Sequence, residues 1–541
     1  MSHRAELLMP AGSLEKLQTA VLYGADAVYL GTPDMSLRTK SKFTLEDITI
    51  GIKYAHEHGV KVYLTLNMFS HNKDIHKLPL FVDTIKKVKP DGVIIADPGV
   101  FQFIKDQAPE LELHVSTQAN VCSWLSVKFW ESLGAKLCVL GREVSFAELT
   151  EIREKCPDIK LETFVHGSMC MAYSGRCLIS NFMSERGANQ GNCNYNCRHN
   201  YKMHIKMNDG TLHDFEVNEE NKNSFQFLVE EENRPGEFME LHEDERGSYL
   251  MNPKDLCLMP RLDELLKLGV DSLKVEGRNK SAYYLGVVTR TYRQAIDDWY
   301  KDPESWNADD YVPEFYTIPN RGYTLAFHDG PLHNLGHNYD NTENLSAWEF
   351  AGKIKEVHDD GLVMLVRNRL QVGDVLEFIP PRSKETTLLR LYEYIIAETR
   401  QVVEKVHGGG KDIFIPFSAF NFKNQDALKD SFHVGELVRK ARVLTHIRKD
   451  RIESDITAFS AEAKGEDPST VKTKRIERIS SKKRPSRLGE NGCCGRGCNG
   501  CLIFTHSPIF AKAREEMEKK KIGEMFERDV RKVQPLPVDS K

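Results

Sequence analysis

Four cysteines lie close together near the middle of this chain. Cys170 and Cys177 are followed by Cys193 and Cys197, in a segment rich in Gly and Asn. The chain has 12 cysteines in 541 residues, so four in so short a segment are many more than an even spread would place there. Thiolates are the usual ligands of zinc and of iron–sulfur clusters. The segment therefore predicts a metal or cluster site.

A fifth cysteine extends this candidate site. Cys257 lies almost ninety residues after Cys170, just before an amphipathic segment. Ligands gathered from separate loops would enclose a site within reach of a substrate, although a closed cluster could equally serve only to hold the loops together. Tight Cys-x-x-Cys pairs favour zinc more than the present spacing does, so an iron–sulfur cluster is favoured and zinc stays open.

The C-terminal tail holds a second group of cysteines, Cys493, Cys494, Cys498 and Cys501, interleaved with glycines. Glycine lets the backbone wrap closely around a metal, so this group predicts a second iron–sulfur cluster or a zinc site. The spacing of the last three cysteines matches a radical-SAM motif. That motif belongs after an early barrel strand and not in a tail, so radical chemistry is not favoured.

Composition limits the class of protein. A hydrophobic content of 40% and a charged content of 28% are typical of a soluble globular protein. No apolar run reaches the roughly 18–20 residues that span a bilayer, so we expect a cytoplasmic protein with no membrane partner. In that compartment clustered cysteines are ligands more often than disulfides. The net charge of −5 gives no overall attraction to nucleic acid.

Short apolar runs alternate with amphipathic segments through the first 300 residues. Eight runs have the length and composition of strands, and most are followed by a helical pattern. This repeat predicts a (β/α)8 barrel, with a doubly wound open sheet as the second choice. The strand candidates are 7–9, 27–30, 61–66, 92–96, 111–117, 137–140, 161–166 and 271–277.

The pattern changes after the barrel and predicts four parts. Residues 1–305 form the barrel, with a cysteine-rich insertion at about 167–258. Short alternating strands broken by Gly and Asp predict a small all-β, barrel-like domain at 306–446. Residues 447–490 are expected to be a flexible basic linker, either solvated or in contact with a phosphate backbone. Residues 491–541 form the cysteine-rich tail with a charged helix.

Polar residues at the ends of the predicted strands are candidates for the chemistry, because active sites of such barrels lie at the C-terminal ends of the strands. Any one of them could instead cap a helix or bind loop backbone. As a set, they point into one mouth. The candidate catalytic residues are Arg142, His166, Lys274, Glu276 and Arg278, and other strand-end residues are Asn67, Asp97, Gln118 and Glu143.

Several blocks of sequence together resemble the collagenase-like peptidase family U32. The segment Glu162–Ser180 is similar to the signature of that family. The blocks Ser36-Leu-Arg, Asp97-Pro-Gly, Arg234-Pro-Gly-Glu and Arg321-Gly-Tyr-Thr resemble those of one branch, the prephenate-dependent tRNA uridine hydroxylases, and the resemblance covers roughly residues 5–445. The other matching blocks are Glu6-Leu-Leu-Met-Pro-Ala-Gly, Tyr23-Gly-Ala-Asp-Ala-Val-Tyr-Leu-Gly, Asn252-Pro-Lys-Asp-Leu and Lys274-Val-Glu-Gly-Arg.

This resemblance implies an oxygen-independent hydroxylation of the wobble uridine of tRNA to 5-hydroxyuridine. It implies a [4Fe-4S] cluster, prephenate as the source of the hydroxyl group, and the anticodon region of tRNA as partner. Carried over by position, the cluster ligands are Cys170, Cys177, Cys193 and Cys257, with Cys197 as the alternative fourth ligand. From residue type, we infer that Arg142, Lys274 and Arg278 bind the two carboxylates of prephenate.

Three alternatives stay open. The family name suggests a peptidase, but the chain has neither a Gly-x-Ser-x-Gly elbow nor a His-Glu-x-x-His motif, and only Cys170 with His166 could form a nucleophile and base. Relatives in the family suggest a hydroxylase that acts on ribosomal RNA or on a quinone precursor. A non-catalytic RNA-binding or maturation protein could use a cluster structurally.

Overall fold

The fold is described from a computed structural model. The described residues are 4–32, 43–170, 172–184, 189, 193, 196–198, 253–330, 346–409, 411–420, 429–442 and 446–465, together with five short strands between 204 and 249. Among these residues, no helix has the length and apolar character needed to cross a membrane. The tail cysteines Cys493, Cys494, Cys498 and Cys501, and residues 466–490 of the predicted linker, lie outside the described residues.

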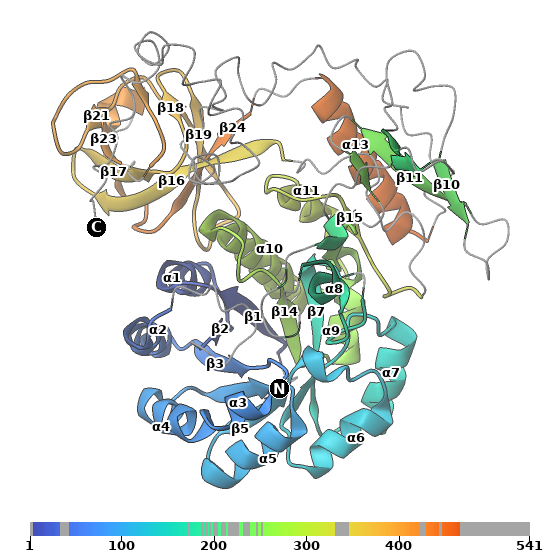
Figure 1. Cartoon of the computed structure of the whole chain (residues 1–541). Coiled ribbons are helices and arrows are strands. Elements are labelled where there is room, and N and C mark those ends of the chain that lie inside the picture. Colours follow the sequence, from blue (N-terminus) through green and yellow to red (C-terminus); the bar gives the residue numbers. More distant parts are fainter. Residues whose placement is uncertain are drawn as a thin grey trace, which may run out of the picture. The chain divides into compact units, whose positions relative to one another are not determined.

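Eight parallel strands close into a barrel, as the sequence predicts (Figure 1). The last of them, β14, pairs in parallel with both β1 and β7, which closes the sheet and excludes the open-sheet alternative. The strands are β1 (Glu6–Ala11), β2 (Ala27–Gly31), β3 (Lys61–Leu66), β4 (Gly92–Ile95), β5 (Glu112–Val115), β6 (Leu137–Val139), β7 (Lys160–Ser168) and β14 (Ser272–Val275).

Helices follow the strands and cover the outside of the barrel (Figure 1). The principal helices are α1 (Leu14–Leu22), α2 (Leu45–Glu57), α4 (Leu78–Val88), α5 (Pro98–Gln107), α6 (Trp124–Ser132), α7 (Phe146–Lys155), α9 (Leu262–Leu268) and α10 (Ala282–Lys301), with the short α3 (Asn72–Ile75) and α8 (Ile179–Ser184). Most of the longer helices begin at a residue whose side-chain oxygen accepts a backbone N–H of the first turn, which satisfies a donor the helix itself leaves unpaired. These N-caps are Ser13, Thr44, Asp97, Ser123, Ser145 and Ser281.

Two short strands extend the barrel sheet beyond β7. Strand β13 (Asp255–Cys257) runs antiparallel to the end of β7, so that Cys257 lies opposite His166. Strand β15 (Tyr323–Thr324) pairs with β13 and forms the edge of the sheet. The insertion between β7 and β13 contains two small antiparallel sheets, made of β8 (His204–Lys206), β9 (Leu212–Asp214), β10 (Phe227–Glu230), β11 (Phe238–Asp244) and β12 (Gly247–Tyr249).

The predicted all-β domain is confirmed, but it begins later than 306. Residues from Tyr311 to Ala326, including α11 (Val312–Phe315), contribute to the barrel core. The β domain has its own hydrophobic core and a seven-stranded antiparallel sheet. Its strands are β16 (Trp348–Val357), β17 (Gly361–Val366), β19 (Val375–Ile379), β20 (Thr387–Arg390), β21 (Ile395–Ile396), β23 (Asp412–Pro416) and β24 (Leu437–Ala441), with the separate pair β18 (Leu370–Gln371) and β22 (Lys405–Val406).

The flexible linker expected from residue 447 is wrong over its first part, because helix α13 (His446–Ala463) occupies this segment. Ile452 and Phe459 are buried in the barrel core. Asp455 accepts a hydrogen bond from the Tyr316 hydroxyl at 2.8 Å. The segment is polar overall, but its helix has one apolar face, and this face packs against the barrel.

The β domain contains a buried carboxyl group that makes its stability depend on pH. Glu436 is 1% exposed, and burial raises its pKa from 4.5 to about 7. The unfolded chain loses this proton near pH 4.5, whereas the folded chain keeps it up to about pH 7. Folding therefore takes up a proton between these values, and the contribution of Glu436 to stability falls by up to about 1.4 kcal/mol per pH unit as the pH rises.

We predict that Glu436→Gln removes this dependence. The free energy of unfolding, measured in urea between pH 5 and pH 7, should fall with pH less steeply in Glu436→Gln than in the unmodified protein. Glu404→Gln, at an exposed carboxylate of the same domain, is the control and should leave the slope unchanged. Equal slopes in all three proteins would contradict the prediction.

Candidate functional site

Four of the predicted polar residues meet at the C-terminal ends of the barrel strands. We call Arg142, Lys274, Glu276 and Arg278 the mouth residues. Arg142 follows β6, while the other three lie on β14 or just after it. Arg142 Nη2 lies 3.4 Å from Glu276 Oε2, and their side chains are only 11% and 12% exposed. The structure therefore brings together residues that are far apart in the chain.

Two aromatic rings form the floor of this group. The Arg142 guanidinium lies 4.0 Å from the centre of the Phe164 ring. Lys274 Nζ lies 4.6 Å from the centre of the Tyr29 ring, and the Arg278 guanidinium lies 5.9 Å from it. Cations are attracted to the faces of such rings. Tyr29 and Phe164 therefore help to hold the three cationic side chains in place.

The loop that carries Arg278 is fixed against the loop after β1. Arg278 Nη1 donates to Thr65 Oγ1 at 3.0 Å, and Lys16 Nζ donates to the Arg278 carbonyl oxygen at 3.1 Å. Gly12 has no room for a side chain, because a Cβ would lie 2.0 Å from that same carbonyl oxygen. The close approach explains why glycine follows β1 and how the guanidinium is positioned.

Lys274 differs from the two arginines because it is already paired within the barrel. Its Nζ lies 2.5 Å from Glu162 Oε1, and the two side chains are 6% and 0% exposed. The mouth residues and Glu162 together contain three cations and two carboxylates. Cations thus outnumber carboxylates by one among these five residues, and the guanidinium groups of Arg142 and Arg278 match a carboxylate ligand better than an ammonium does.

His166 does not lie among the mouth residues, which corrects its predicted place there. Its side chain is buried, and its ring packs against the rings of Tyr284, Tyr292, Phe315 and Tyr323. Burial lowers the pKa of His166 to about 3, so the imidazole is neutral at ordinary pH. It occupies the aromatic core behind the end of β7. This position does not support a direct catalytic role.

The cysteine loop, residues 170–198, is anchored over the same end of the barrel. Ser174 donates to the Glu143 carboxylate through its N–H at 3.1 Å and its hydroxyl at 2.9 Å. Gly175 has a φ of +75°, and a Cβ there would lie 2.1 Å from the Gln118 carbonyl oxygen. Glu143 follows β6 and Gln118 follows β5. These contacts hold the chain between Cys170 and Cys177 against two strand ends.

A second anchor joins a later part of this loop. Asn189 Nδ2 donates to the Cys177 carbonyl oxygen at 3.1 Å, and the Phe69 N–H, which follows β3, donates to the Asn189 carbonyl oxygen at 3.1 Å. Cys170 is exposed, while Cys177, Cys193 and Cys197 are partly exposed. Accessible thiols in one loop are chemically suited to bind a cluster.

Cys257 has a different environment. Its side chain is fully buried on β13 and hydrogen-bonds with the Tyr292 hydroxyl, and burial raises the pKa of its thiol to about 12. Within the described part of the chain, no group of three or more His, Cys, Asp or Glu side chains is arranged to hold a metal ion. The donor types of the cysteine loop fit an iron–sulfur cluster, whereas Cys257 would have to lose a proton that the core favours.

Residues that support the site were harder to find in the sequence. In the sequence, Glu143 is one of several strand-end residues, but in the structure it receives the hydrogen bonds that anchor the cysteine loop. Glu162 lies in an apolar strand, and its carboxylate pairs with Lys274. Tyr29 and Phe164 look like ordinary strand residues. Only their alternation with small or aliphatic neighbours could have placed them on the inner face.

We predict that Glu143→Gln loosens the cysteine loop. An amide oxygen replaces a charged acceptor that binds both the N–H and the hydroxyl of Ser174, a loss of about 1–3 kcal/mol. Hydrogen exchange of peptides that cover residues 172–177, measured by mass spectrometry, should therefore become about tenfold faster or more. Glu151→Gln, at an exposed position on α7, is the matched control. Unchanged exchange in Glu143→Gln would rule out this anchor.

Three characterised relatives are similar to this chain over most of its length. The tRNA hydroxylation protein P of Escherichia coli K12 is 37% identical over 435 residues, which cover 76% of this chain and 94% of that protein. The tRNA hydroxylation protein P1 of Bacillus subtilis 168 is 34% identical, covering 72% and 86%. The 23S rRNA 5-hydroxycytidine C2501 synthase of E. coli K12 is 29% identical, covering 71% and 53%.

The family model agrees with these similarities. The model of peptidase family U32 matches residues 12–337, which is more than half of the chain. The matched segment contains the whole barrel after β1, the mouth residues and the cysteine loop. The chain therefore belongs to peptidase family U32.

Proposed function

We propose that this protein hydroxylates a pyrimidine base of RNA, with the wobble uridine of tRNA as its substrate and 5-hydroxyuridine as the product. The observation that carries the proposal is the similarity to two tRNA hydroxylation proteins over most of both chains. A third relative, by its name, makes 5-hydroxycytidine in ribosomal RNA. Hydroxylation of RNA is what these three names have in common.

The mouth residues suit prephenate as the source of the hydroxyl group. Prephenate carries two carboxylates, and the guanidinium fork matches a carboxylate with two parallel hydrogen bonds. Arg142 and Arg278 lie on the same aromatic floor. Binding of prephenate would give Arg142 a second carboxylate partner besides Glu276, which lies 3.4 Å away.

The cysteine loop suits a [4Fe-4S] cluster next to this mouth. Cys170, Cys177 and Cys193 would be three of its ligands, and the fourth would be Cys257 or Cys197. When bound, the cluster would supply electron transfer or a Lewis-acidic iron close to the substrates. Glu143 and Gln118 would keep the ligand loop above the mouth, and Phe164 would orient Arg142.

A peptidase is less well supported, although the family carries that name. A cysteine nucleophile needs a base within hydrogen-bonding reach. His166, the base that the sequence offered to Cys170, is enclosed by four aromatic rings, and burial lowers its pKa to about 3, so it is a weak proton acceptor. Ribosomal RNA and a quinone precursor stay as alternative substrates, and a non-catalytic RNA-binding role stays as an alternative function.

We predict that deletion of the gene removes 5-hydroxyuridine and its derivatives from cellular tRNA, as measured by mass spectrometry of nucleosides. The unmodified protein should restore them, and Cys170→Ser should not. Cys156→Ser is the matched control, because Cys156 is a buried cysteine at the end of α7, away from the loop. Intact modification in the deletion strain would refute the proposed substrate.

Iron measurements on the same proteins separate the cluster from the activity. Protein purified without oxygen should contain iron in the Cys156→Ser variant and lose most of it in Cys170→Ser. Iron should also be lost in either Cys257→Ser or Cys197→Ser, and the variant that loses iron identifies the fourth ligand. Full iron content in Cys170→Ser would contradict the proposed ligand set.

A further inference from the structure

A row of polar side chains runs through the interior of the barrel. We call Glu6, Ser272, Glu162 and Lys274 the axial row. Glu6 on β1, Ser272 on β14 and Glu162 on β7 are in register with one another, so they form one layer near the start of the strands. Lys274 is two residues further along β14, in the next layer towards the mouth. The row therefore runs from the layer near the start of the strands towards the mouth.

Short contacts link each member of the axial row to the next. Lys274 Nζ lies 2.5 Å from Glu162 Oε1. The Ser272 hydroxyl donates to Glu162 Oε2 at 2.8 Å and lies 3.5 Å from Glu6 Oε1. Ser272 and Glu162 are both buried, at 1% and 0% exposure. A proton could therefore move along the row without a step through open solvent.

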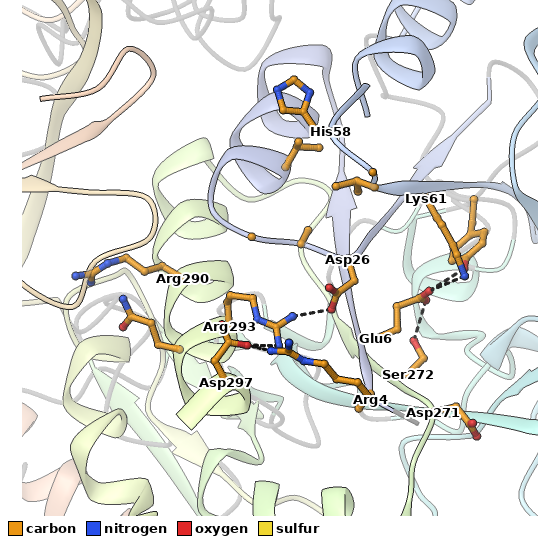
Figure 2. Close-up of a pocket in the computed structure, with 18 of the residues that line it drawn as sticks. Arg4, Glu6, Asp26, His58, Lys61, Asp271, Ser272, Arg290, Arg293 and Asp297 are labelled. Carbon is orange, nitrogen blue, oxygen red and sulfur yellow. Dashed lines mark hydrogen bonds and ion pairs between the residues drawn. The ribbon is translucent and has the colours of Figure 1, made fainter. Parts of the chain in front are cut away.

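The other end of the row faces a cavity of about 550 Å³ at the N-terminal end of the barrel (Figure 2). Glu6 lines this cavity and lies 3.7 Å from Lys61, whose side chain is 50% exposed. Other charged groups of the cavity pair with one another, since Arg293 lies 2.7 Å from Asp26 and 2.6 Å from Asp297. Glu6 and Ser272 both line the cavity, so the axial row meets water there, and Glu6 is the titratable residue of the two.

The hydrogen bonds of the row have a direction. A serine hydroxyl carries one proton, and the shorter contact shows that Ser272 gives it to Glu162. Burial, and then the charge of Glu162, raise the pKa of Glu6, while Lys61, the Tyr63 hydroxyl and His114 act in the opposite direction. Tyr63 donates to Glu6 Oε2 at 2.9 Å. This leaves Glu6 Oε1 as the atom that can carry a proton towards Ser272.

We propose a proton path, formed by Glu6, Ser272 and Glu162, that reprotonates Lys274 with protons from the N-terminal cavity. After the Lys274 ammonium gives a proton to a ligand in the mouth, Ser272 passes its proton to Glu162 and takes one from Glu6. Glu6 takes a proton from water in the cavity, and the Glu162 carboxyl turns and gives its proton to Lys274. One proton enters from water, one proton leaves to the ligand, and no electrons are transferred.

Such a path would supply protons to the mouth, at the opposite end of the barrel, where water has restricted access. The cysteine loop is anchored over the mouth, and a bound RNA loop would exclude water there further. This part of the inference rests on the proposed function. The path itself needs only the axial row and the cavity, so the two can be tested separately.

The first experiment measures the protonation of Glu6 without any substrate. Infrared spectra of the full chain, recorded as the pH is raised, should contain a protonated carboxyl band that persists above the ordinary pKa of glutamate, is lost in Glu6→Gln, is shifted in Ser272→Ala and is unchanged in Thr19→Val. Thr19 is a suitable control because its hydroxyl is buried on α1, outside the row. Absence of a band that depends on Glu6 would overturn the path, whatever reaction the protein catalyses.

The second experiment measures turnover with tRNA. Ser272→Ala should lower kcat for hydroxylation by about tenfold or more, leave KM for tRNA unchanged and increase the rate difference between H2O and D2O. Ser272→Thr, which keeps a hydroxyl, should recover most of the rate, and Glu6→Gln should match Ser272→Ala. Unchanged kcat and isotope effect in both Ser272→Ala and Glu6→Gln would overturn the path. A wild-type protein that makes no hydroxylated base would instead refute the proposed function.

Discussion

The pairing of β14 with β1 on one side and β7 on the other is the interaction on which the whole site depends. It closes the barrel, and it also places a strand from residue 272 between two strands that precede it by more than a hundred residues. Glu276 reaches Arg142 only because of this closure, and Lys274 reaches Glu162 for the same reason. The insertion must leave the barrel after β7 and return before β14, so the cysteine loop starts at the mouth.

Much of the barrel could be predicted from the sequence because its strands are apolar on both faces and separated by amphipathic helices. Each of the eight predicted strands overlaps an observed one, and the small β domain followed from its alternating pattern. Helix α13 could not be predicted in this way. Its apolar residues Ile452 and Phe459 are embedded in a highly charged segment, and their burial is decided by contacts with the barrel.

Within the candidate site, position relative to the strands predicts more than residue type does. Residues that follow strands, such as Arg142 and Glu276, lie together at the mouth. The side-chain chemistry of His166 and Cys257 suits a site, but both project into the same buried aromatic region, in register across β7 and β13. Successive side chains of a strand point to opposite faces of the sheet, so a shift of one residue decides whether a side chain faces the mouth or the core. A bulge in the pairing of β7 with β14 changes this alternation near His166.

Helix α13 has a consequence for the solubility of the barrel. Strand β15 is the edge of the extended barrel sheet, and an uncovered edge offers its N–H groups to other chains. Asp455 accepts from the Tyr323 N–H at 3.2 Å, and Glu462 accepts from the Leu325 N–H at 3.0 Å. Two carboxylates thus occupy donors that a foreign strand would need, and they add negative charge beside them. Helix α13 therefore hinders the pairing of this sheet edge with strands of other molecules.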